Sequence, residues 1–229
     1  MFGWIILATA SMGIGCGMPK NSLNLHQRSM QVVNVSVEQT VLAKASLEFL
    51  GPDRNVRLLR LRGTPYEMGF QHGVLLRNEI DAFYRSLMWR LKFFVKEETL
   101  DEVYDLMDPY IPQEQKEEMR GLAHGAGVPL RVVHWVHSIP EAVEYGEKSR
   151  FRRFWKETSC SNIAAFGSAT PDGALYHLRV LDWIRELAVK SPPTILVHVP
   201  DVGHASVTFS YAGFIGCISG MNDAQMSFG

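Results

Sequence analysis

Residues 156–183 read KETSCSNIAAFGSATPDGALYHLRVLDW, and the spacing of apolar residues in this stretch decides how the chain folds. Polar and apolar residues alternate on both sides of TPDG, where proline presets φ and glycine accepts the positive φ that ends a turn. The pattern predicts two short strands joined by that turn. Cys160 begins the first strand, and Arg179 and Asp182 stand near the end of the second.

The chain after residue 159 continues in the same extended pattern. Further β-rich runs follow, divided by Pro, Gly, Asp and Asn: TILVHVP, ASVTFSYAG, GCISGM and QMSFG. They predict a sheet whose strands are hairpin-like neighbours.

The chain before Cys160 is mainly helical in pattern. VRLLRL predicts one strand, and apolar residues then recur at helical spacing over 66–95, which predicts a long helix with one buried face. Further helices are predicted at 99–111, 112–127 and 130–139. Three aromatic residues are expected in the core: Trp89, Phe93 and Phe94. Helices followed by a sheet favour an α+β fold over alternating βαβ units.

The composition is that of a globular protein. The chain has 229 residues, of which 46% are hydrophobic and 21% charged, with a formal net charge of −1. This balance gives no reason to expect nucleic acid as a partner, because nucleic-acid binders usually carry a clustered basic excess. The one basic cluster, KSRFRRFW at 148–155, is interpreted as a solvated loop or processing segment. The three cysteines are too widely spaced for a disulfide framework or a zinc site, and no cofactor is expected.

The N-terminus has the pattern of an export signal. MFGWIILATASMGIGC at 1–16 is a short apolar run closed by Cys16, and it resembles a bacterial lipoprotein signal in which that cysteine carries the lipid. The segment 17–50 is then interpreted as a linker. We expect an exported protein whose contact with a membrane is made through this lipid anchor alone.

The residues around Cys160 leave two interpretations open. One is a structural strand cysteine beside a surface ion pair. The other is a nucleophile, because a nearby guanidinium favours the thiolate and a carboxylate can orient an ammonium group or the thiol. If the Ser159–Cys160 bond were cleaved, the α-amine of Cys160, with a free pKa of about 8, would be a base suited to neutral pH.

Other chemistry-bearing residues have simpler interpretations. His134, His137 and Glu141 could lie on one helix face, but Pro140 is expected to interrupt that helix, so a metal site is not predicted. His72 and His124 are interpreted as packing or hydrogen-bonding residues, and Cys217 as a buried strand residue. The glycines of GLAHGAG, at 121–127, resemble a phosphate loop only superficially, because no strand precedes them and no Lys-Ser/Thr follows.

The order CSNIAAF…DGALYHLRVLDW resembles the nucleophile hairpin of N-terminal-nucleophile hydrolases related to isopenicillin-N (acyl-CoA:6-aminopenicillanic acid) acyltransferase. It is similar, more distantly, to acid ceramidases and to bile-salt and penicillin-V hydrolases. Segments at 62–76 and 119–129, and GCISGMNDAQMSFG at the end, match the same group. The resemblance implies a four-layer αββα fold, with 51–159 as its helical part and 160–229 as the beginning of the sheet part that bears the nucleophile.

The resemblance also implies roles for particular residues. Cys160 would be the nucleophile, released by self-cleavage after Ser159 and supported by Arg179 and Asp182. Asn222 matches an asparagine of a Gly-Met-Asn turn, with a structural or site-wall role, and Gln225 stands where a glycine is common. The oxyanion-hole asparagine of this group lies beyond residue 229, so the sequence is interpreted as a fragment.

Three functions follow from these interpretations. The first is an exported amidohydrolase or acyltransferase that acts on a linear C–N bond of a small amide or acyl substrate through a thioester on Cys160. The second is a non-catalytic lipoprotein that keeps an incomplete fold as a binding module. The third is a thiol peptidase that uses a Cys–His pair without processing.

Overall fold

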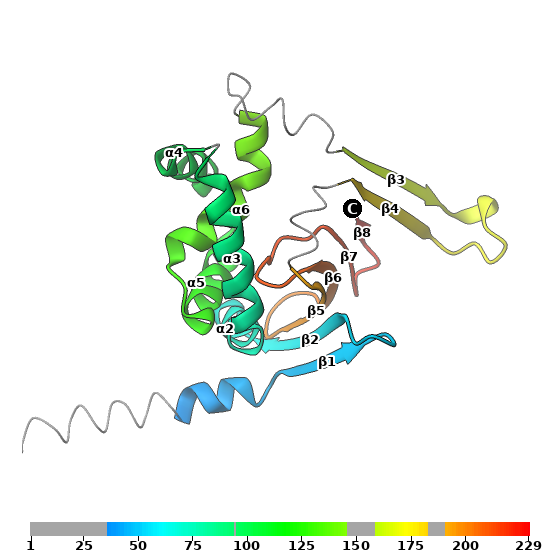
Figure 1. Ribbon diagram of the computed structural model, residues 1–229. Helices are drawn as coiled ribbons and strands as arrows, with labels where there is room; N and C mark the ends of the chain where they lie inside the picture. Colours follow the sequence, from blue (N-terminus) through cyan, green and yellow to red (C-terminus); the bar gives the residue numbers. More distant parts are fainter. Residues whose placement is uncertain (1–35, 94, 146–158, 183–190) are drawn as a thin grey trace, which may run out of the picture. The chain divides into compact units, whose positions relative to one another are not determined.

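The computed structural model describes residues 36–93, 95–145, 159–182 and 191–229 (Figure 1). The chain divides into two units, Met1–Gln39 and Thr40–Gly229, and every labelled element lies in the second. Its helices precede most of its strands in the chain, so the α+β class predicted from the sequence is confirmed. Phe94 and the basic cluster at 148–155, for which the sequence made predictions, lie outside the described residues.

The helices follow the predicted order but not all of the predicted bounds. They are α2 (Pro65–Leu75), α3 (Arg77–Leu91), α4 (Glu97–Met107), α5 (Gln113–Ala126) and α6 (Leu130–Tyr145), with short 3-10 turns at Asp108–Tyr110 and Gly167–Ala169. The single long helix predicted over 66–95 was wrong, because the chain bends at Leu76 (φ −119°, ψ 26°). Leu76 is fully buried, and the apolar spacing runs through the bend without a proline or glycine to mark it. α6 continues past Pro140, which was expected to end it.

The main sheet has six strands in the order β1-β2-β5-β6-β7-β8. The bounds are β1 (Ser46–Leu50), β2 (Val56–Gly63), β5 (Pro193–Pro200), β6 (Ser206–Tyr211), β7 (Ser219–Asn222) and β8 (Ser227–Phe228). β2 and β5 are parallel, and the other pairs are antiparallel. The predicted sheet of hairpin-like neighbours is therefore correct for the antiparallel pairs but not for β2 and β5. A parallel pair needs a long crossover, and here that crossover contains all five labelled helices. β1 falls in the segment interpreted as a linker and was not predicted.

The stretch around Cys160 forms the predicted hairpin, as a separate two-stranded sheet. β3 (Ser159–Ala165) and β4 (Tyr176–Asp182) pair antiparallel, and neither belongs to the six-stranded sheet. Gly173 has φ +71°, and its N–H donates to the Thr170 carbonyl at 3.3 Å, as the TPDG turn requires.

The core lies between the helices and one face of the main sheet. Leu59 and Leu61 on β2 and Leu196 on β5 are fully buried in the same cluster as the apolar faces of α2, α3, α5 and α6. Trp89 and Phe93 were expected in this core, but they are 59% and 64% exposed. Trp89 lies near the end of α3 and Phe93 two residues past it, and their rings make a T-shaped contact with the Lys92 ammonium group over both.

Helices α2 and α5 pack with their backbones in direct contact at four glycines. On α2, a Cβ at Gly69 would lie 2.0 Å from the Glu118 carbonyl oxygen, and a Cβ at Gly73 would lie 2.5 Å from the Leu122 carbonyl oxygen. A Cβ at Gly121 or Gly125 on α5 would lie 2.0 Å or 2.2 Å from carbonyl oxygens of α2. Each helix carries its two glycines four residues apart, so only glycine permits this approach. This contact explains GLAHG more directly than any phosphate loop.

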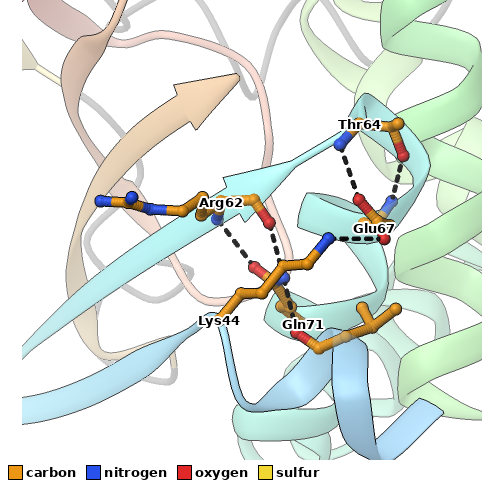
Figure 2. A network of polar contacts seen from close by, with 6 residues as sticks. Lys44, Arg62, Thr64, Glu67 and Gln71 are labelled. Atoms are coloured by element: carbon orange, nitrogen blue, oxygen red, sulfur yellow. Dashed lines mark hydrogen bonds and ion pairs between the residues drawn. The ribbon is translucent and has the colours of Figure 1, made fainter. Parts of the chain in front are cut away.

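The start of α2 is held by a network of polar contacts (Figure 2). The backbone N–H of Thr64 donates to Glu67 Oε2 at 2.9 Å, and Glu67 N–H donates back to Thr64 Oγ1, which makes a capping box. Gln71 is fully buried: its amide nitrogen donates to the carbonyls of Val41 and Arg62, and its oxygen accepts from Arg62 N–H at 2.9 Å. The network therefore ties the end of β2 and the chain before β1 to α2.

The glycine contact generates a prediction about stability. Replacing a glycine by alanine inside an open helix normally stabilises it by about 1 kcal/mol. Gly69→Ala should instead lower the free energy of unfolding by about 2 kcal/mol, because the new methyl group forces the two backbones apart. Urea unfolding measures the change. Gln115→Ala on the exposed face of α5 is the control and should stay within about 0.5 kcal/mol of the wild type. A stabilised Gly69→Ala variant would contradict the close packing.

Candidate active site

The β3–β4 hairpin has one polar face and one apolar face. Side chains alternate along each strand, and the register pairs Cys160 with Leu181, Asn162 with Arg179 and Ala164 with His177. Cysteine, asparagine, arginine and histidine therefore share one face. The other face carries apolar side chains that are about half exposed or more: Ile163, Leu178, Val180 and Tyr176.

Cys160 and Arg179 meet on the polar face. Arg179 Nη2 donates to Cys160 Sγ at 3.1 Å, so the predicted return of the arginine to the thiol is observed. Cys160 is exposed and Arg179 half-buried. The Nε and Nη1 atoms of Arg179 are buried and have no hydrogen-bond partner among the described residues. Leaving such donors unsatisfied costs about 1–3 kcal/mol each, which favours a role in a site over a role in stability.

Asp182 is the last residue of β4, and its backbone lies opposite Ser159. The backbone at the carboxyl end of β4 is therefore placed beside the Ser159–Cys160 bond. The side chains of Ser159 and Asp182 are outside the described part of the structure, so their contacts stay a prediction.

Asn222 organises the turn between β7 and β8. Its Oδ1 accepts from the backbone N–H groups of Ala224 at 3.1 Å and Met226 at 3.0 Å. This agrees with the structural role that was one of two expected for it. Gln225 has φ +62°, a left-handed conformation, which explains on physical grounds why glycine suits this position.

Two residues of the polar face were missed by sequence reasoning. His177 Nε2 lies 3.3 Å from Asn162 Oδ1, and its Nδ1 lies 3.2 Å from Ser227 Oγ on β8. Asn162 is exposed and His177 half-buried. The signal that could have found them is the alternation itself, because Asn162 stands two residues after Cys160 and His177 two residues before Arg179.

Buried side chains of three helices hold the loop between β6 and β7. His72 Nε2 on α2 accepts from Gly213 N–H, and His137 Nε2 on α6 accepts from Ile215 N–H, both at 3.0 Å. Tyr84 on α3 donates to the Gly213 carbonyl at 2.5 Å. Burial lowers the pKa of His72 to about 3, and repulsion from His198 and His137 in their protonated forms adds to this shift. Burial lowers the pKa of His137 to about 4. Both rings are therefore neutral acceptors at neutral pH.

Cys217 lies at the end of that loop and differs from Cys160. It was predicted to be a buried strand residue, but it is half-buried and lies in the loop before β7. Burial raises the pKa of its thiol to about 11, and the charge of Arg179 opposes only part of this shift. Arg179 therefore acts on both free thiols, but only Cys160 is exposed and receives its hydrogen bond.

Three histidines of α5 and α6 are occupied by ring contacts or hydrogen bonds within the protein. His134 stacks on Tyr104 with ring centroids 3.8 Å apart, and His137 Nδ1 lies 2.7 Å from the Val133 carbonyl. His124 Nδ1 lies 2.7 Å from the Tyr66 hydroxyl, in the α2–α5 contact. Within the described ranges no three His, Cys, Asp or Glu side chains gather as metal ligands. In the same ranges, the hydrogen-bond partner of Cys160 is Arg179 rather than a histidine.

The N-terminal predictions fall mostly outside the described residues. Cys16 and the segment 1–16 are among residues of which nothing is described, so lipid attachment and export stay predictions. In the part of the chain that the structure covers, no helix has both the length and the apolar character to span a bilayer.

Comparisons with known proteins give distant relatives. No protein-family model matches the chain. The protein dcd1A of Dictyostelium discoideum is 26% identical over 94% of this chain and 52% of its own length. The protein dcd1B of the same organism is 28% identical over 78% of this chain and 38% of its own length. An uncharacterized protein of Archaeoglobus fulgidus is 26% identical over 75% of this chain and 32% of its own length. The chain therefore spans about half the length of the first relative and less of the other two.

The contrast between the two thiols predicts their reactivity. At pH 7, iodoacetamide should label Cys160 in the folded protein and leave Cys217 largely unmodified, as followed by peptide mass mapping. Arg179→Leu should slow labelling of Cys160 at least about tenfold, because it removes the guanidinium that donates to the sulfur at 3.1 Å. Arg179→Lys keeps the charge and should retain most of the rate. Equal rates in all three proteins would exclude an activated thiol.

The buried histidines predict a loss of stability in acid. The pKa values of His72 and His137 lie below their ordinary value of 6.5 in the folded protein, so below that pH the unfolded chain binds more protons. The free energy of unfolding should therefore fall as the pH falls from about 6.5 towards 4, by up to about 1.4 kcal/mol per pH unit for each histidine. His137→Gln retains an acceptor without titrating. Urea unfolding across this range should give that variant a shallower slope, and an unchanged slope would contradict the assignment.

Proposed function

We propose that the chain is a cysteine amidohydrolase or acyltransferase of the N-terminal-nucleophile class, with Cys160 as its nucleophile. The observation that carries the proposal is the hydrogen bond from Arg179 Nη2 to Cys160 Sγ at 3.1 Å, on a hairpin whose last residue lies opposite Ser159. The resemblance of the surrounding motifs to that class supports it.

The proposed maturation is an attack by Cys160 Sγ on the carbonyl carbon of Ser159. The S–C bond forms, the C–N bond to Cys160 breaks, and the nitrogen takes up a proton, leaving Ser159 as a thioester on the thiol. This step already frees the α-amine of Cys160, and water then hydrolyses the thioester, which frees the thiol and leaves Ser159 as a carboxylate. That amine, with a free pKa of about 8, would serve as the base in later turnovers, oriented by Asp182.

In turnover, Cys160 would attack the carbonyl of a linear amide and hold the acyl group as a thioester. The leaving amine takes a proton from the α-ammonium group, and water or a second amine then accepts the acyl group. The substrate class is a small amide or acyl compound. Arg179 would hold the sulfur in place through its hydrogen bond before each attack.

The four-layer αββα arrangement belongs to the same proposal. Helices cover one face of the six-stranded sheet, and the opposite face carries apolar side chains that solvent still reaches. Ile195 pairs with Phe209, and Val207 pairs with Met221, of which Phe209 is 49% and Met221 52% exposed. A second sheet packed there would bury them, as two facing sheets do at a spacing of about 10 Å. Export with a lipid on Cys16 completes the proposal.

Intact-mass analysis of the full chain tests the proposal. Purified protein should yield two chains, one that ends at Ser159 and one that begins at Cys160. Cys160→Ala should give one unprocessed chain. Cys217→Ala is the matched control and should be processed like the wild type. A single wild-type chain that still hydrolyses amides would overturn the mechanism. An unprocessed chain whose Cys160 is also inert to iodoacetamide would instead support the binding module.

A further inference from the structure

We propose that Asn162 is a second catalytic residue of this site, which donates a hydrogen bond from its carboxamide nitrogen to the carbonyl oxygen under attack by Cys160. His177 is its positioning residue. The inference rests on the proposed function and deepens it, because it names the group that stabilises the oxyanion within the described residues.

The first argument is placement. Cys160 and Asn162 are two residues apart on β3 and share the polar face, so their Cα atoms are about 6.6 Å apart. A carbonyl group bonded to Sγ, followed by one hydrogen bond, spans this gap. Asn162 is exposed on that face, as Cys160 is, so a ligand at the thiol can reach both side chains.

The second argument is which hydrogen-bond donors on the polar face of the hairpin are available to a substrate. Attack by a thiolate moves negative charge onto the carbonyl oxygen, and a donor aimed at that oxygen accelerates the step. Arg179 Nη2 is engaged with the sulfur, and both ring nitrogens of His177 are engaged with Asn162 and Ser227. The Nε and Nη1 donors of Arg179 have no partner but are buried, so a ligand in solvent does not reach them. In the described part of the chain, the carboxamide nitrogen of Asn162 is thus the remaining donor on an exposed side chain of this face.

The third argument is orientation. An exposed asparagine rotates freely unless its amide oxygen is held. When the Ser227 hydroxyl donates to His177 Nδ1, the Nε2–H of the neutral ring donates to Asn162 Oδ1, and one tautomer satisfies both contacts. The fixed oxygen leaves the NH₂ group directed away from His177. β8 thereby links this residue to the six-stranded sheet.

The proposed step is balanced without any further group. Cys160 thiolate forms an S–C bond to the acyl carbon, and the C=O electron pair moves to oxygen, which accepts the hydrogen bond of Asn162. When the tetrahedral intermediate collapses, the bond to the leaving group breaks and that group departs with its electron pair. Alkylation of the same sulfur by iodoacetamide proceeds by direct displacement of iodide and creates no oxyanion.

This difference in chemistry defines the experiment. The full chain is treated with p-nitrophenyl acetate or with iodoacetamide, and modification of Cys160 is followed by peptide mass mapping. Asn162→Leu should slow acylation by about tenfold to a hundredfold and leave alkylation within about twofold. His177→Leu should slow acylation alone, and His177→Gln, which keeps an N–H donor, should restore most of the rate. Ser161→Ala, on the opposite hairpin face, is the control and should change neither rate.

Each outcome decides the inference. Equal acylation rates in wild type and Asn162→Leu, with Cys160 reactive to both reagents, would overturn the role of Asn162 and leave the proposed nucleophile intact. Equal losses of acylation and alkylation in Asn162→Leu would show that the residue acts on the thiol, which also overturns the inference. A wild-type Cys160 inert to both reagents would overturn the proposed function and this inference together.

Discussion

The backbone contact between α2 and α5 is the constraint on which the rest of the described structure depends. Glycines 69 and 73 face 121 and 125, and any side chain at these positions would overlap a carbonyl group of the other helix. Because the two helices lie this close, His72 and the capped start of α2 are held against the sheet. Arg77 then donates to the Gly125 carbonyl, which ties the start of α3 to the end of α5.

Hydrogen bonds between uncharged groups connect the helices to the sheet. His72, Tyr84 and His137 hold the β6–β7 loop by its backbone, and that loop leads to Cys217 and β7. β7 and its turn at Asn222 position β8, whose Ser227 meets His177 of the hairpin. The candidate site is thus linked to the core by a short series of hydrogen bonds, and the neutral histidines make that link sensitive to acid.

Much of this fold follows from local rules. Alternation around TPDG predicted the β3–β4 hairpin and the meeting of Arg179 with Cys160, because a tight turn and a period of two leave few other registers. Helical spacing predicted one buried face over 66–95, on which Ile80 and Leu87 lie, although not the bend at Leu76, which no proline or glycine marks. Trp89 and Phe93 were misplaced because aromatic character was given more weight than their place at and beyond the end of α3.

By itself the sequence determined that helices precede most of the strands, the hairpin that carries Cys160 and the pairing of its two halves, since each depends on neighbours in the chain. Only the tertiary structure decided that β2 lies parallel to β5 and that the hairpin forms a sheet of its own. It also decided that GLAHG packs against GFQHG and that His177 holds Asn162. These features depend on contacts between residues far apart in sequence, whose free energy is set by close packing and by buried hydrogen bonds that no local pattern records.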